Sequence, residues 1–155
     1  MAEHAHQQGQ GTYPALAIEM SIDFVIMYFV MYTMIATVDH LRLNVNNVYM
    51  TLMMVAPMTI VMLVGMRSMF PSKRMNLLIG AIAAFVFLAS FGAMRTQAAV
   101  GDEQFLKSMI PHHSGAILMC KEASLRDRQI IELCKNIVQS QQAEIEQMQA
   151  LLARF

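Results

Sequence analysis

The chain has 155 residues, enough for one small domain or for a membrane anchor followed by a helical hairpin. Hydrophobic residues make up 56% of it and charged residues only 14%, a balance that favours a membrane protein over a soluble domain. The formal net charge is +0, which gives no electrostatic case for binding nucleic acid.

A polar tail, residues 1–14, opens the chain and contains neither lysine nor arginine. A secretory signal peptide begins with a basic segment, so the sequence predicts that this tail is not one. His4 and His6 form a His-x-His pair that could hold a metal loosely, but we favour a solvated, disordered tail.

Three apolar segments follow within residues 15–96, which we expect to form the transmembrane region. A helix needs about 20 mostly apolar residues to cross a bilayer, and its backbone must satisfy its own hydrogen bonds there. Because the connections are short, we predict three antiparallel transmembrane helices at residues 15–38, 48–66 and 77–94.

Basic residues near the spans predict the orientation. Arg67, Lys73 and Arg74 cluster in the second loop, which the positive-inside rule places in the cytoplasm. The N-terminus is then cytoplasmic and the C-terminal third lies on the outer side. Asp39 and His40 follow the first span on that outer side. They could supplement a metal site or contact the hairpin, but we favour a simple polar helix end.

Methionine recurs every four residues in the second predicted span. Because four residues overshoot one turn, successive members drift by about 40° and the row winds around the helix. A ladder of thioethers could pass Cu(I) through the membrane, whereas methionine also fills irregular seams between helices. The possible conduit consists of Met50, Met54, Met58, Met62 and Met66.

The last third of the chain, residues 97–155, has the pattern of a helical hairpin. Two amphipathic helices are predicted at residues 102–124 and 127–153, with Asp102 and Asp127 as N-caps. Pro111 lies inside the first of them and should kink or restart it.

Soft donors gather on one face of the first hairpin helix, in the stretch MIPHHSGAILMC at residues 109–120. At about 100° per residue, two histidines, two methionines and a cysteine share this face with Ala116, which leaves space at its centre. In an antiparallel hairpin Met148 meets Met109, with Glu144 and Gln141 towards the histidines. The donors on the first helix are Met109, His112, His113, Met119 and Cys120.

Thioether, thiolate and imidazole together favour Cu(I) over hard cations, and zinc does not use methionine. The alternative is that the methionines fill the core and the histidines lie on an exposed edge. Cys120 and Cys134 fall near the turn, where they could form a disulfide, hold Cu(I) together or remain buried thiols.

The hairpin resembles a known family, the ferritin-like domain of unknown function numbered three hundred and five. Its hallmarks are a Met-x-x-His-His-x-x-Ala-x-x-Met run and a later Gln-x-x-Glu-Ile-x-x-Met run. The first begins at Met109 and the second at Gln141, and the resemblance covers about residues 100–152. It implies copper binding by the histidine and methionine positions in a bacterial, extracytoplasmic or membrane-attached protein.

Longer members of that family carry a four-helix unit, whereas this chain has only the hairpin. Two helices cannot enclose a core alone. We therefore expect an all-α protein with three transmembrane helices and a hairpin, 97–155, that completes a bundle by homo-oligomerisation or by docking on the membrane helices.

The expected function is copper sequestration, buffering or delivery at a bacterial inner membrane, with the hairpin in the periplasm. The expected partners are membrane lipid, further copies of the chain and a copper donor or acceptor protein. Cu(I) would bind His112, His113, Met109, Met119 and Met148, with Glu144 and Gln141 orienting the imidazoles. No catalytic constellation is evident, so we expect no enzyme activity.

Two rival functions remain. A transporter that uses the methionine ladder predicts copper flux into liposomes that is lost when Met50, Met54 and Met58 become leucine. A homo-oligomeric assembly module without metal predicts that replacing His112 and His113 leaves the metal content at background.

Overall fold

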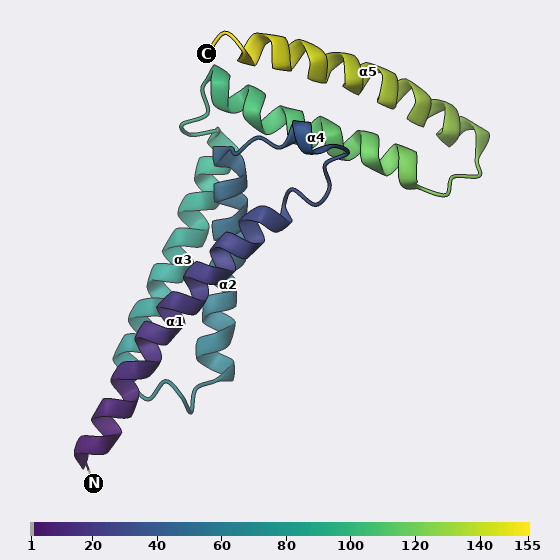
Figure 1. Cartoon of the computed structure of the whole chain (residues 1–155). Helices are drawn as coiled ribbons and strands as arrows, with labels where there is room; N and C mark the ends of the chain where they lie inside the picture. The colour runs from purple at the N-terminus through teal and green to yellow at the C-terminus, as the bar shows by residue number, and fades with distance from the viewer. Residues whose placement is uncertain (1) are drawn as a thin grey trace. The chain divides into compact units, whose positions relative to one another are not determined.

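The computed structural model describes the backbone of residues 2–155 and the side chains of residues 13–155, so His4 and His6 lie outside the described side chains. The described residues form five α-helices, one short 3-10 helix and no strand (Figure 1). They divide into two compact units, which we call the membrane unit (residues 2–29 and 48–98) and the outer unit (residues 30–47 and 99–155).

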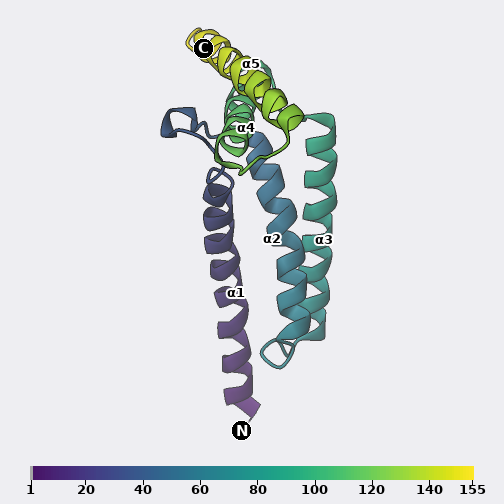
Figure 2. The same cartoon turned by 90° about the vertical axis from the view of Figure 1, so that its right-hand side faces the viewer.

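Three helices are long and apolar enough to cross a membrane, as predicted. They are α1 (Ala2–Val30), α2 (Val45–Gly65) and α3 (Lys73–Thr96), and the apolar part of α1 begins at Tyr13. Figure 2 shows the three helices running alongside one another. Large apolar side chains such as Phe85 and Leu88 point outward from α3 and are well exposed, which suits a lipid environment.

The membrane unit is held together by a small apolar core and by a polar anchor at one end. Leu16, Leu63 and Phe70 form the core. The Tyr13 hydroxyl donates to Asn76 Oδ1 at 2.7 Å, which ties α1 to the start of α3. Ser72 caps α3 by accepting the amide N–H of Met75.

The first helix ends at Val30, not at Val38 as the hydropathy predicted. The chain instead folds back on itself, because polar groups beyond Val30 find partners there. Tyr32 Oη donates to the carbonyl oxygen of Arg42 at 2.8 Å, and Asn44 Nδ2 donates to the same carbonyl at 3.0 Å. This segment contains the 3-10 helix η1 (Val38–His40) and belongs to the outer unit.

The outer unit is an antiparallel hairpin of α4 (Asp102–Glu122) and α5 (Arg128–Leu152), close to the predicted bounds. Its core residues recur at helical spacing on the facing sides of the two helices. Ile110 and Ile145 are fully buried, so the two helices meet there. The buried core consists of Leu106, Ile110, Ile117, Ile145 and Met148.

The N-cap of one hairpin helix differs from the prediction. Asp127 caps α5 as predicted, accepting the N–H groups of Gln129 and Ile130. Gly101, not Asp102, occupies the cap position of α4, because Asp102 already has helical geometry and lies in the first turn. The helix also continues through Pro111 without a restart.

A disulfide joins Cys120 in the last turn of α4 to Cys134 in α5, with 5.3 Å between their Cα atoms. Of the three alternatives that the sequence leaves open, the structure adopts this one. The two sulfurs are bonded to each other, so they do not serve as thiolate ligands in this state. Their assignment as possible metal ligands stays a prediction that concerns only the reduced chain.

Candidate metal centre

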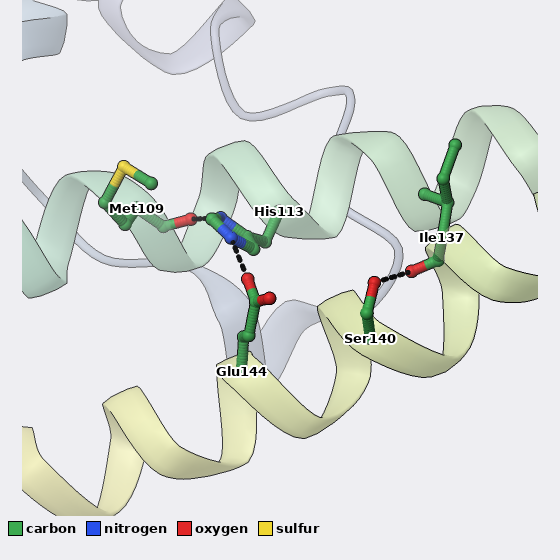
Figure 3. Close-up of polar contacts among 5 residues, drawn as sticks. All are labelled: Met109, His113, Ile137, Ser140 and Glu144. Carbon is green, nitrogen blue, oxygen red and sulfur yellow. Dashed lines mark hydrogen bonds and ion pairs between the residues drawn. The ribbon is translucent and has the colours of Figure 1, made fainter.

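His113 has the best-defined polar contacts among the candidate ligands of the hairpin. Its Nε2 lies 2.7 Å from Glu144 Oε2 on α5, and its Nδ1 lies 2.9 Å from the carbonyl oxygen of Met109 one turn earlier on α4 (Figure 3). The His113 side chain is only 8% exposed, whereas Glu144 is 52% exposed. The expected meeting of Glu144 with the histidine run is thus confirmed.

The two contacts fix where protons must lie on the imidazole. A carbonyl oxygen can only accept a hydrogen bond, so Nδ1 carries a hydrogen and donates it to Met109. An ionised carboxylate also only accepts, so the short contact between Nε2 and Glu144 needs one further proton between the two atoms. A metal ion held by Nε2 would take the place of this proton.

Two thioethers belong to the core of the same hairpin. Met148 is 9% exposed and lies among the buried residues around Ile145. Met109 packs against that cluster, as expected from its antiparallel position to Met148. Figure 3 shows its side chain directed away from Glu144, so the thioether and the carboxylate lie on different sides of the imidazole.

His112 and Met119 occupy the flank of α4. Met119 is 60% exposed, and His112 is exposed as well, with its ring centroid 6.0 Å from that of His113. The repeat of Leu106, Ile110 and Ile117 decides which side of α4 is buried, and it turns these two donors outward. Gln141 is half-buried one turn before Glu144.

Among the side chains that the structure describes, no group of three or more His, Cys, Asp or Glu residues is arranged to hold a metal. His113 with Glu144 is a pair, not a closed set of ligands. A metal site on this hairpin therefore depends on thioether ligands, or on donors from another copy of the chain.

A buried histidine outside the motif adjoins the same stretch of α4. His40 of η1 is 7% exposed, and its Nδ1 lies 2.8 Å from Ser114 Oγ. The same oxygen accepts the backbone N–H of Ala36 at 2.7 Å, so Ser114 ties residues 36–40 to α4. We call these contacts the Ser114 latch. The favoured prediction of a simple polar helix end at His40 was wrong.

Burial lowers the pKa of His40 below its ordinary value of 6.5. The nearby carboxylate of Asp39 raises this pKa to a lesser degree, whereas the positive charges of Arg42 and Lys121 lower it further. His40 is therefore held in its neutral form near pH 7, which suits a hydrogen bond with a hydroxyl group.

The methionine row of α2 does not line a single interior surface. Met58 is 38% exposed and Met66 is 40% exposed, whereas Met62 packs against the core of the membrane unit. Met50 and Met54 are partly buried. The sulfurs thus wind around α2, as the drift of a four-residue repeat dictates.

Comparisons with known proteins bear on the hairpin and on part of the membrane unit. Residues 66–152 match the model of a domain of unknown function (DUF305). An uncharacterized protein, L153, of Acanthamoeba polyphaga mimivirus is 36% identical over 118 residues, which cover 75% of this chain and 76% of that protein. No solved structure matches the chain.

Proposed function

This chain belongs to the family of domains of unknown function (DUF305), and we propose that it is a membrane-anchored protein that binds Cu(I). Binding would serve copper sequestration, buffering or delivery. The proposal assigns the anchor to α1, α2 and α3 and the metal to the hairpin of α4 and α5.

The arrangement around His113 carries this proposal. The side chain is buried between the two helices, with Nδ1 fixed by the Met109 carbonyl and Nε2 aimed at Glu144. An imidazole oriented by a backbone carbonyl is typical of a metal ligand, because the first hydrogen bond fixes the ring and its tautomer. Met109 and Met148 supply thioethers in the same core, and that combination suits Cu(I).

In this proposal His113 Nε2 and the thioether of Met148 are inner ligands, and the side chain of Met109 turns from its present direction to bring its thioether to the same ion. Glu144, now bound to Nε2, would shift to orient a neighbouring imidazole once a metal replaces the shared proton, with Gln141 beside it. His112 and Met119 would complete the site from the exposed flank of α4, either in the same chain or across a contact with a second copy.

Exposed apolar side chains of the hairpin support a proposal of self-association. Met119, Ile130 and Leu133 are between 48% and 60% exposed, so the hairpin leaves apolar surface uncovered. We propose that copies of the chain associate through their hairpins and exchange copper with a donor or acceptor protein at the exposed histidine.

The disulfide supports an extracytoplasmic position for the hairpin, because such bonds persist in oxidising compartments. We propose the orientation predicted from the basic loop, with the N-terminus in the cytoplasm and the hairpin in the periplasm of a bacterial inner membrane.

The test is the copper content of the purified full chain, measured by elemental analysis with copper kept reduced. We expect the wild type to retain copper and the double variant His112→Ala/His113→Ala to fall to background. The matched control is His4→Ala/His6→Ala, which removes the same number of imidazoles from the tail and should retain copper. Equal copper in all three proteins would contradict the proposal and favour the assembly module.

A further inference from the structure

The open end of the hairpin, opposite the turn, carries a groove of about 430 Å³ that the proposed metal site does not use. It lies where the first turn of α4 meets the end of α5, and Figure 1 shows the C-terminus beside the start of α4. The residues that line it are Asp102, Phe105, Leu106, Leu151, Arg154 and Phe155.

Apolar side chains around this groove are unusually open to solvent. Phe105 is 50% exposed, Leu151 is 36% exposed and Phe155 is 71% exposed, whereas Leu106 beneath them is buried in the hairpin core. Two phenyl rings and a leucine side by side form an exposed apolar patch of the kind that marks a binding surface.

The same groove holds one carboxylate and one guanidinium, from Asp102 and Arg154. Neither side chain forms a hydrogen bond or an ion pair within the part of the chain that the structure describes. The adjacent Glu103 and Lys107 neutralise each other across 2.6 Å and add no net charge. The groove therefore offers an anion and a cation beside an apolar patch.

The connection between the third span and this groove is short. With 24 residues at 1.5 Å each, α3 is about 36 Å long, which exceeds the hydrocarbon core of about 30 Å and brings its end into the headgroup layer. Only residues 97–101 separate α3 from α4, and five residues span at most about 18 Å.

We propose that the groove binds a zwitterionic phospholipid of the membrane surface. Arg154 pairs with the phosphate, since guanidinium groups match phosphate oxygens in a planar fork, and Asp102 pairs with the ammonium group. Phe105, Leu151 and Phe155 contact the glycerol and the upper acyl chains. A site with charges of both signs favours such a lipid over an anionic one, which Asp102 repels.

The chain contains no tryptophan, so one introduced tryptophan is the sole indole fluorophore. We suggest Phe105→Trp in the full-length protein, reconstituted in phosphatidylcholine vesicles with or without brominated acyl chains. We expect bromine to quench most of its emission, and to do the same for Phe155→Trp. The matched control is Asn136→Trp, an exposed position of α5 towards the other end of the hairpin, which should keep its emission.

Charge variants test the headgroup assignment. In the Phe105→Trp background, Asp102→Asn or Arg154→Gln should reduce quenching severalfold, and vesicles of brominated phosphatidylglycerol should quench less than brominated phosphatidylcholine. If brominated lipid quenches the emission of neither Phe105→Trp nor Phe155→Trp, the proposal is overturned and a second copy of the chain is favoured as the occupant. Stronger quenching by the anionic lipid would overturn the zwitterionic assignment.

Discussion

The two ring nitrogens of His113 contact the Met109 carbonyl and the Glu144 carboxylate. Glu144 is therefore the neighbouring side chain whose charge should most affect metal binding at His113. The carboxylate takes part in the hydrogen bond at Nε2 and would balance the charge of a bound cation. An uncharged amide of the same shape cannot balance that charge. The effect should appear in metal affinity more than in stability, because Glu144 is half exposed.

We therefore expect Glu144→Gln to weaken Cu(I) binding by about 10- to 100-fold, the usual effect of removing a group that orients a ligand. Competition with a Cu(I) chelator measures this affinity. Glu146→Gln is the matched control, because Glu146 is exposed, lies two residues away and accepts a hydrogen bond from Gln142 on its own helix. Similar losses in both variants would argue against a role for Glu144 at the site.

His40 makes the Ser114 latch sensitive to pH. Its pKa is lowered in the folded chain by burial and by Arg42 and Lys121, despite the opposing effect of Asp39. A lowered pKa means that the folded state binds fewer protons than the unfolded one. The stabilisation is therefore fully present above pH 6.5, the ordinary value, and is lost as the pH falls through the lowered folded value.

The corresponding prediction concerns hydrogen exchange in residues 31–44. Protection of the Ala36 amide, which donates to Ser114, should fall as the pH drops below 6.5, after correction for the intrinsic exchange rate. In His40→Gln, which does not titrate, the protection should no longer depend on pH in this range. A wild-type profile that is flat between neutral and mildly acidic pH would exclude His40 as the cause.

At the scale of elements, the hairpin depends on the bond between its two helices near the turn. The chain between Cys120 and Cys134 is short, with a separation of 14 residues, so the disulfide closes a small loop in the unfolded state. Loop closure of this size is worth about 3 kcal/mol in the chain-entropy account. This amount is a large part of what a two-helix core provides.

We expect Cys120→Ser/Cys134→Ser to destabilise the hairpin by about 3 kcal/mol, measured by denaturant unfolding of the full chain. Copper content should stay at the wild-type level under conditions where the hairpin is folded, because the bonded sulfurs are not ligands. Reducing agent added to the wild type is the control and should reproduce the loss of stability. If the folded double variant loses copper, Cys120 and Cys134 are copper ligands after all.

Helix positions were largely predictable where the signal is local. Long apolar runs identify α2 and α3, and helical spacing around Asp127 identifies α5. The end of α1 was not predictable, because residues 31–38 are apolar enough to continue a span. Only the polar contacts of Tyr32 and Asn44 with the Arg42 carbonyl show why the chain turns back.

The candidate site was predictable in part for the same reason. Antiparallel pairing of two helices brings Glu144 to the histidine run, and counting from the turn is enough to see it. The outward position of His112 and Met119 depends on which of two adjacent faces the isoleucines bury. Contact of His40 with the hairpin was an alternative and not the favoured prediction, because its partner Ser114 lies far away in the sequence and no local pattern pairs the two residues.

For the whole molecule, the Ser114 latch means that the family match and the folded unit have different limits. The matched region starts at residue 66, yet the outer unit includes residues 30–47, which supply Ala36 and His40 to α4. A fragment cut at the family limits would leave Ser114 without either partner and open the adjoining surface of α4 to water. The stability of a hairpin expressed alone would thus differ from that of the hairpin in the full chain. A soluble fragment for biophysical work should include residues 30–47.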